Sequence, residues 1–219
     1  MRVVIAGGHG KIALRLARLL ADGGNQSVGL IRNPEHTSEV RAAGAEPVVC
    51  DLESAAPDDV VAAVEGADAV VFAAGAGPGS GVARKDTMDR AGAALLADAA
   101  ERARVRRYLL ISSMGLDRPS RLAPDDVFGA YLRAKAASED DLRARDLDWT
   151  ILRPGRLNDD PGTGQVRLAE SVPRGAVSRQ DVAAVVAGLL DVPASAGLTL
   201  ELVGGDTPIS DAVAAVTRG

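Results

Sequence analysis

Arg2-Val-Val-Ile-Ala-Gly-Gly-His-Gly-Lys-Ile-Ala-Leu-Arg-Leu-Ala17 is the stretch around which the rest of the chain is organised. Its first five residues form a β-branched, apolar run that is too short for a helix. A cluster of glycines follows at positions 7, 8 and 10. Apolar residues then recur at helical spacing: Ile12, Leu14, Leu16, Leu19 and Leu20. The pattern predicts a strand, a tight glycine turn and a helix.

This turn has the spacing G-x-x-G-x-x-A. Gly7 would make the tight turn, Gly10 would allow close approach of a ligand to the backbone, and Ala13 would let the helix pack closely on the strand. Such a turn aims the positive end of a helix, with its unpaired N–H groups, at a pyrophosphate. We therefore expect a bound dinucleotide. The other interpretation is a glycine turn in an unrelated α/β protein.

Composition limits the function classes. The 219 residues are 47% hydrophobic but only 2% aromatic, and the net charge of -5 is spread along the chain. Without a basic stripe, nucleic-acid binding is not expected. There is no apolar run of about 18 residues and no signal segment before the first strand, so we expect a cytoplasmic protein without a membrane partner. The single Cys50 excludes an internal disulfide and a cysteine metal cluster, and no metal site is predicted.

Apolar runs alternate with helical patterns along the next 150 residues. Strands are predicted over 27–32, 46–50, 68–73, 105–112 and 147–153, and helices over 35–43, 57–65, 84–103 and 127–145. This alternation predicts an α/β fold, a Rossmann-type doubly wound parallel sheet. Residues 1–219 would form one NAD(P)-binding domain. Within it, residues 154–219, with strands at 165–169 and 198–203 and helices over 179–191 and from about 210, would form a small substrate-side extension.

Residues at predicted strand ends are candidates for cofactor contacts. Arg32 ends the second strand, where an Arg pairs with the 2′-phosphate of NADP and an acidic residue binds the ribose of NAD. NADP is therefore expected, with NAD as the alternative; a solvated strand-end charge is the other interpretation of Arg32. Asp51 follows the third strand and would either accept a hydrogen bond from adenine, with Leu52 packing on the ring, or cap a turn. Ala73, Ala74 and Gly75 are small enough for a ribose or nicotinamide to lie against the backbone.

Tyr131 and Lys135 lie four residues apart on one helix face, after Ser112 and Ser113 at the end of the fifth strand. The Lys135 ammonium would stabilise the Tyr131 phenolate. The phenol would then give a proton to a carbonyl oxygen as hydride arrives, while a serine hydroxyl holds that oxygen. The competing interpretation is an amphipathic helix with a packed tyrosine and a solvated lysine.

These motifs together resemble the short-chain dehydrogenase/reductase superfamily. The segment Trp149-Thr-Ile-Leu-Arg-Pro-Gly155 and the short C-terminal part resemble its atypical NAD(P)H-binding branch, which includes flavin reductase/biliverdin reductase-like and negative-transcriptional-regulator-like proteins. The resemblance implies Ser113 as the carbonyl-holding residue, Tyr131 as proton donor and Lys135 as its partner. It departs at Asp89, where extended members of the family usually carry an Asn, which puts a proton relay built on that Asn in doubt.

The sequence thus predicts an NADP(H)-dependent oxidoreductase acting on a small carbonyl, quinone or flavin-like acceptor. The alternatives are a non-catalytic NADP(H)-binding redox sensor and, less favoured because the C-terminal part is small, a sugar-nucleotide epimerase or dehydratase. The chain would be a monomer or a homodimer. The pocket formed by the loops around Gly77, Arg118 and Asp159 would set specificity. The expected cofactor-binding residues are Gly7, Gly8, His9, Gly10, Lys11, Ile12, Arg32, Asp51, Leu52, Ala73, Ala74, Gly75, Ser112 and Pro154.

Overall fold

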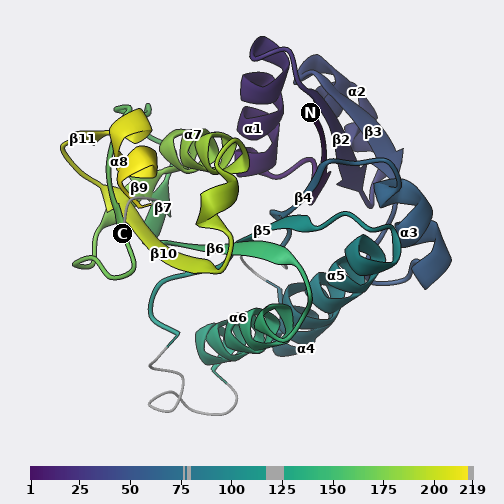
Figure 1. Ribbon diagram of the computed structural model, residues 1–219. Coiled ribbons are helices and arrows are strands. Elements are labelled where there is room, and N and C mark those ends of the chain that lie inside the picture. Colours follow the sequence, from purple (N-terminus) through teal and green to yellow (C-terminus); the bar gives the residue numbers. More distant parts are fainter. Residues whose placement is uncertain (76, 78–79, 117–125, 217–219) are drawn as a thin grey trace.

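A nine-stranded sheet runs through the computed structural model, which describes residues 1–75, 77, 80–116 and 126–216 (Figure 1). Arg118 of the predicted specificity pocket and Ala76 lie outside this part of the chain. From edge to edge the strands are β3 (Ala45–Val49), β2 (Gln26–Ile31), β1 (Arg2–Ala6), β4 (Ala69–Phe72), β5 (Arg107–Ile111), β6 (Asp148–Pro154), β10 (Leu198–Gly204), β8 (Gln165–Ala169) and β11 (Thr207–Pro208). The strands from β3 to β10 pair in parallel, whereas β8 runs antiparallel to both neighbours.

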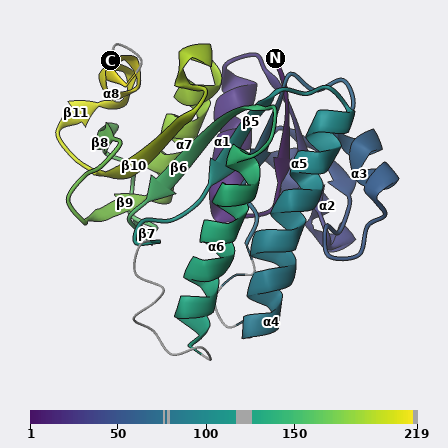
Figure 2. The ribbon, with the colours of Figure 1, turned by 60° about the horizontal axis from the view of Figure 1, so that its bottom comes forward.

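Helices cover both faces of this sheet (Figures 1 and 2). One face carries α1 (Lys11–Asp22), α2 (Thr37–Ala42), α7 (Arg179–Leu190) and α8 (Ile209–Ala215). The other carries α3 (Pro57–Val64), α5 (Ala93–Arg102) and α6 (Val127–Arg143). Leu16 and Leu189 are fully buried on the first face, as are Leu96 and Val64 on the second. Small helical residues such as Ala13, Ala97 and Ala100 allow this close packing because they bring the helix backbone near the strands.

The predicted doubly wound parallel sheet is confirmed. The strand order β3-β2-β1-β4-β5-β6 is that of a Rossmann sheet, in which ligands bind at the carboxyl ends of the strands where the order reverses. Three of the strands beyond Pro154, β8, β10 and β11, belong to this same sheet. The first to join it is β10, which pairs with β6 in parallel, with Leu200 opposite Leu152. The C-terminal segment therefore extends the same sheet on its β6 side.

Two regions differ from the sequence prediction. The regular helix expected over 84–103 is wrong in its first half: α4 (Val82–Arg84) leads into η2 (Lys85–Gly92), a π-helical segment, before α5 begins. A π-helical turn depends on tertiary packing, and such turns occur frequently at functional sites. The sequence also missed β7 (Arg156–Asn158) and β9 (Ala176–Ser178), which pair in parallel as a separate two-stranded sheet. Three residues are too few to show a strand periodicity.

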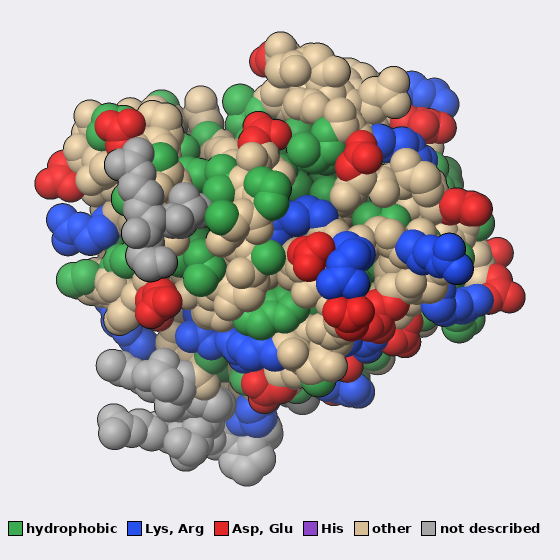
Figure 3. All heavy atoms as spheres, in the orientation of Figure 1, with side chains coloured by type: hydrophobic (Ala, Val, Ile, Leu, Met, Phe, Trp, Pro, Cys, Tyr) green, Lys and Arg blue, Asp and Glu red, His purple; other side chains and the backbone are tan. Residues whose placement is uncertain are grey.

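The remaining short helices are η1 (Pro34–His36) and η4 (Pro193–Ser195), both 3₁₀. None of the helices in the described ranges has the length and apolar character needed to cross a bilayer. On the face of the molecule drawn in Figure 3, acidic and basic side chains lie interspersed.

A buried polar cluster fastens β5 to the extension. The Arg107 guanidinium donates hydrogen bonds to Thr150 Oγ1 (2.8 Å), to Ser195 Oγ (2.7 Å) and to the carbonyl oxygen of Leu189 (2.8 Å). Thr150 Oγ1 in turn donates to the carbonyl oxygen of Ser195 (2.7 Å). Burial lowers the pKa of Arg107 to about 10. These hydrogen bonds compensate the Arg107 cation for its lost contact with water. Removing any one of the partners is therefore expected to lower the free energy of unfolding.

Thr150→Val is expected to lower the free energy of unfolding by about 1–3 kcal/mol, because it leaves an Arg107 N–H and the Ser195 carbonyl unpaired in a fully buried place. Urea unfolding followed by circular dichroism would measure this loss. Thr207→Val, at an exposed position in β11, is the matched control and should stay within about 0.5 kcal/mol of the parent. Equal effects of the two changes would contradict the role given to the cluster.

Candidate cofactor and substrate site

The glycine turn after β1 fits tightly between two neighbouring strands. Gly7 has a φ of 76°, and a Cβ there would lie 2.7 Å from Cα of Ala74 at the end of β4. A Cβ on Gly8 would lie 2.6 Å from Cα of Gly29 in β2. The Gly10 N–H donates to the carbonyl oxygen of Gly7 (2.7 Å) and closes the turn. Only glycine fits at the first two positions, so the sequence here is dictated by backbone contact.

This turn opens into a cavity of about 330 Å³ at the carboxyl ends of β1, β2, β3 and β4. Nine predicted cofactor-binding residues line it: Gly7, His9, Gly10, Arg32, Asp51, Leu52, Ala73, Ala74 and Gly75. Gly8 does not, because it is buried against β2. Ile12 packs on the hydrophobic core instead.

The amino end of α1 lies at the same turn. Gly10 is its N-cap and has no side chain to satisfy the first N–H groups of the helix. The Lys11 side chain leaves the turn: its Nζ lies 2.5 Å from Oδ2 of Asp159 in the extension. Arg179 approaches the other oxygen of Asp159 at 3.0 Å. The hydrogen bond from Lys11 lowers the pKa of Asp159 below its ordinary value, and the charge of Arg179 acts in the same direction.

Arg32 and Asp51 line this cavity just beyond the ends of β2 and β3. Arg32 is exposed, with its Nη1 3.9 Å from Oε2 of Glu53. Asp51 Oδ1 accepts a hydrogen bond from the Glu53 N–H (3.1 Å), so Asp51 does cap a turn while it also faces the cavity. Glu53 itself accepts bonds from Arg84 (2.9 Å) and Thr87 (2.6 Å). Burial alone would raise the pKa of Glu53, but these bonds and the nearby arginine charges lower it.

Two histidines form one wall of the same cavity. The His9 and His36 rings are stacked, with centroids 3.6 Å apart and an interplanar angle of 12°. His9 Nε2 also lies 3.1 Å from Oε2 of Glu39. The sequence singled out His9 only as part of the glycine turn and missed His36, since no local spacing links positions 9 and 36.

Cys50 is half-buried in the cavity wall. Burial, reinforced by the charges of Asp59 and Asp51, raises the pKa of its thiol, so the thiolate is disfavoured. The thiol therefore contributes packing surface to this wall.

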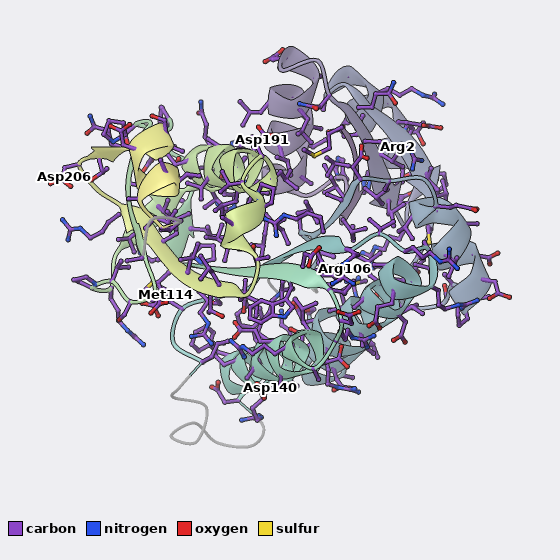
Figure 4. All side chains as sticks on the ribbon, viewed as in Figure 1. Arg2, Arg106, Met114, Asp140, Asp191 and Asp206 are labelled. Carbon is purple, nitrogen blue, oxygen red and sulfur yellow. The ribbon has the colours of Figure 1, made fainter. Side chains whose placement is uncertain are left out.

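A second, larger cavity of about 720 Å³ begins at the end of β5. Four residues singled out from the sequence line it: Ser112, Ser113, Tyr131 and Pro154. Ser112 is 6% exposed, and its Oγ has no hydrogen-bond partner among the described residues. Ser113 Oγ donates to the carbonyl oxygen of Met114 (3.3 Å). Met114 lies on the side of the molecule where the strands of the extension gather (Figure 4).

Lys135 is buried beside this cavity. Its Nζ donates to the carbonyl oxygen of Ile111 (3.1 Å) and lies 3.4 Å from Oδ1 of the fully buried Asp89. From the sequence, Asp89 occupies the position where extended family members usually carry an Asn. In the fold, its carboxylate lies next to Lys135. The cation that faces the Tyr131 ring is a different one: Lys85 Nζ lies 5.3 Å from the ring centroid and donates to the carbonyl oxygen of Gly77 (2.9 Å).

Lys85 and Asp89 both come from the π-helical segment η2, which packs against α6. Sequence reasoning missed Lys85, along with the apolar and basic residues of the larger cavity: Phe128, Leu132, Leu157, Arg156 and Arg174. Phe128 precedes Tyr131 by three residues and Leu132 by four, so helical spacing is a signal that would have placed Phe128 beside both. No local pattern marks the two arginines.

The chain matches the family model described as NAD(P)H-binding over residues 7–193. It belongs to this NAD(P)H-binding family. The resemblance to atypical short-chain dehydrogenases/reductases is confirmed, and the matched region contains the glycine turn, both cavities and Asp89.

Three similar proteins extend over nearly the whole chain. A Bacillus subtilis protein named "Uncharacterized sugar epimerase" is 36% identical and aligns with 97% of this chain and 99% of its own. A solved structure from Bacillus halodurans, provisionally named an NAD-dependent epimerase/dehydratase, is 36% identical with a TM-score of 0.91 and covers 99% of this chain and 100% of its own. An anaerobilin reductase from Escherichia coli O157:H7 is 26% identical with a TM-score of 0.79, covering 94% and 98%.

The residues present fit the nicotinamide dinucleotide that the family name implies. Gly7 and Gly10 form a cradle that a Cβ would fill, and it lies at an uncapped helix end suited to a pyrophosphate. The buried Ser112 hydroxyl supplies a polar atom at the start of the second cavity. A ligand lying from one cavity to the other would pass the ends of β4 and β5, which are adjacent in the sheet.

Gly7→Ala is expected to lower the free energy of unfolding by about 2–5 kcal/mol and to weaken NADPH binding. Roughly 1–2 kcal/mol comes from the left-handed backbone, and the remainder from the overlap with Ala74. Gly24→Ala is a closely matched control, because Gly24 has a φ of 74° but open space around its Cβ position. It should cost only the backbone part. Urea unfolding and NADPH titration of both variants would measure this, and equal losses would refute the steric account.

Proposed function

We propose that this member of the NAD(P)H-binding family is an NADP(H)-dependent oxidoreductase that reduces a small carbonyl, quinone or flavin-like acceptor. One observation carries the proposal: Ser112, Ser113 and Tyr131 line a single cavity at the carboxyl end of β5, beside the glycine-lined cavity of β1 and β4. The reductase name of the Escherichia coli neighbour supports it.

The chain's residues divide the binding work between the two cavities. The turn at Gly7 and Gly10 would hold the pyrophosphate, and Arg32 would pair with the 2′-phosphate of the adenosine ribose. Asp51 would accept a hydrogen bond from adenine, with Leu52 against its ring. Ala73, Ala74 and Gly75 have no bulk to block the path along the end of β4, while Ser112 and Pro154 would border the nicotinamide. When bound, the cofactor supplies a hydride.

Proton delivery is assigned to the residues around Tyr131. A serine hydroxyl, Ser113 by resemblance to the family and Ser112 by its unpaired Oγ, would hold the acceptor oxygen. Tyr131 would donate its phenolic proton to that oxygen and regain one from solvent. Lys85, above the ring, would stabilise the phenolate electrostatically. Lys135, held between Asp89 and Ile111, would contribute positive charge from beneath the strand end.

A sugar-nucleotide epimerase is the competing function, since the Bacillus subtilis relative carries that name. The wall of the larger cavity is mostly apolar, with Phe128, Leu132 and Leu157 among its side chains. A sugar needs many polar partners. This wall therefore favours an apolar acceptor.

Arg32→Ala tests the cofactor choice. The parent is expected to bind NADPH more tightly than NADH, and the variant should lose about tenfold in NADPH affinity with NADH affinity unchanged, because one charge-assisted contact is removed from a partly exposed site. Calorimetric titration measures both affinities. Arg41→Ala, an exposed arginine on α2 outside both cavities, is the control. Equal affinity of the parent for the two cofactors would contradict the assignment of Arg32.

Tyr131→Phe tests the chemistry. With NADPH and a panel of quinones, aldehydes and flavins, the variant should turn over carbonyl acceptors about 10²–10⁴-fold more slowly, since it lacks the proton donor. NADPH affinity should not change. Tyr108→Phe removes the chain's other phenol, which is buried in β5 with its hydroxyl 3.4 Å from the Ala93 carbonyl oxygen, and should retain turnover.

Retained turnover in Tyr131→Phe would reject the tyrosine as proton donor and favour direct hydride transfer to a flavin. Tight NADPH binding without turnover of any acceptor would reject an enzymatic function and favour a non-catalytic NADP(H)-binding redox sensor. Epimerisation of a nucleotide sugar would support the competing function.

A further inference from the structure

Two arginines border the larger cavity on the side of the extension. Arg156 begins β7, and Arg174 lies two residues before β9. The two strands pair in parallel, and the Arg156 N–H donates to the carbonyl oxygen of Gly175 (3.0 Å). A Cβ on Gly155 would lie only 2.4 Å from that same oxygen. The backbones that carry the two guanidinium groups are therefore held in close contact.

Neither arginine has an acidic partner within ion-pair distance in the part of the chain that the structure describes. Several other arginines are paired, for example Arg106 with Asp146 (3.0 Å), Arg153 with Glu139 (2.5 Å) and Arg179 with Asp159 (3.0 Å). The described lining of the cavity contains both arginines and no carboxylate. This wall consequently offers positive charge that the described side chains do not neutralise.

Arg174 reaches the reactive end of the cavity. A Cβ placed on Gly115 would lie 2.9 Å from Arg174 Nη2, so the guanidinium lies against the backbone of the turn that follows Ser112 and Ser113. Gly115 also has a φ of 89°, which suits glycine. The guanidinium thus contacts Gly115, which lies three positions after Ser112 in the chain. The Ser112 hydroxyl has no hydrogen-bond partner among the described residues.

Most of the remaining wall is apolar. The Phe128 and Tyr131 rings lie 6.1 Å apart with an interplanar angle of 27°, and Met114, Leu132 and Leu157 complete it. Phe128 is 59% exposed, so most of its ring surface is accessible to a ligand in the cavity. A volume of about 720 Å³ is large enough for a compound of several fused rings.

We propose that this cavity binds an amphiphilic organic anion: a flat, apolar body packs on Phe128 and Leu157 while its carboxylate, or an equivalent anionic group, pairs with Arg156 and Arg174. Guanidinium groups suit this role because their planar donors match a carboxylate. In the proposed oxidoreductase this anion is the acceptor, and that assignment rests on the proposed function. The binding itself is independent of turnover.

Paired fluorescent probes test the inference. 1-Pyrenebutyrate and its neutral amide share one apolar body and differ in charge, and each is titrated into the full-length protein in the presence of NADP⁺. The carboxylate should bind at least tenfold more tightly than the amide. Combined Arg156→Ala and Arg174→Ala should lower carboxylate affinity to that of the amide and leave amide affinity unchanged. Arg18→Ala, an exposed arginine on α1 outside both cavities, should change neither.

Equal affinity for the two probes, absence of binding by both, or an equal loss in Arg18→Ala would overturn the inference. Single Arg156→Gln and Arg174→Gln variants, checked by circular dichroism, keep the test valid if the double variant does not fold, and each should lower carboxylate affinity severalfold. NADPH titration is run on the same samples. Arginine-dependent probe binding without NADPH binding would reject the proposed function alone, and NADPH binding without charge selectivity would reject the anion site alone.

Discussion

Steric exclusion at the glycine turn is the constraint on which the rest of the molecule depends. The turn after β1 touches the backbone of β4 through Gly7 and that of β2 through Gly8, at distances that leave no room for a Cβ. These contacts place the amino end of α1 at the switch point of the sheet. Because β1 pairs with β2 and β4, a side chain at Gly7 would displace the end of β4 and one at Gly8 would displace β2. The same two glycines are therefore needed both for the shape of the glycine-lined cavity and for the packing of the central strands.

Charged contacts connect this turn to the C-terminal extension. Lys11, which follows the last glycine, pairs with Asp159, and Arg179 at the start of α7 approaches the same carboxylate. Arg107 makes a second connection, from β5 to the segment that precedes β10. The first connection is exposed and so weakly stabilising, whereas the second is partly buried and donates hydrogen bonds to Leu189 and Ser195 of the extension. The β10–β6 ladder, the hydrogen bonds of Arg107 and the apolar packing of α7 against the sheet and α1 hold the extension in place.

Much of the fold could be predicted because its signals are local. β1, β4 and β5 are continuous apolar runs, and the glycine turn has a fixed spacing. The site was only partly predictable, because it is assembled from distant segments. Asp89 was found through family register, but its approach to Lys135 depends on how η2 packs on α6. Position 85 carries no motif, and the three-residue strands β7 and β9 carry no periodicity, so Lys85, Arg156 and Arg174 could be recognised only in the folded chain.

The small β7–β9 sheet has a consequence for how such proteins diversify. It stands apart from the nine-stranded sheet, and its pairing uses backbone atoms only. The side chain at position 156, in this ladder, and that at position 174, two residues before it, can therefore be exchanged by mutation without removing a hydrogen bond of the ladder. The glycine turn has no such freedom. One scaffold can thus keep the fixed backbone geometry of the glycine turn while the side chains at a few exposed positions around the larger cavity change by mutation.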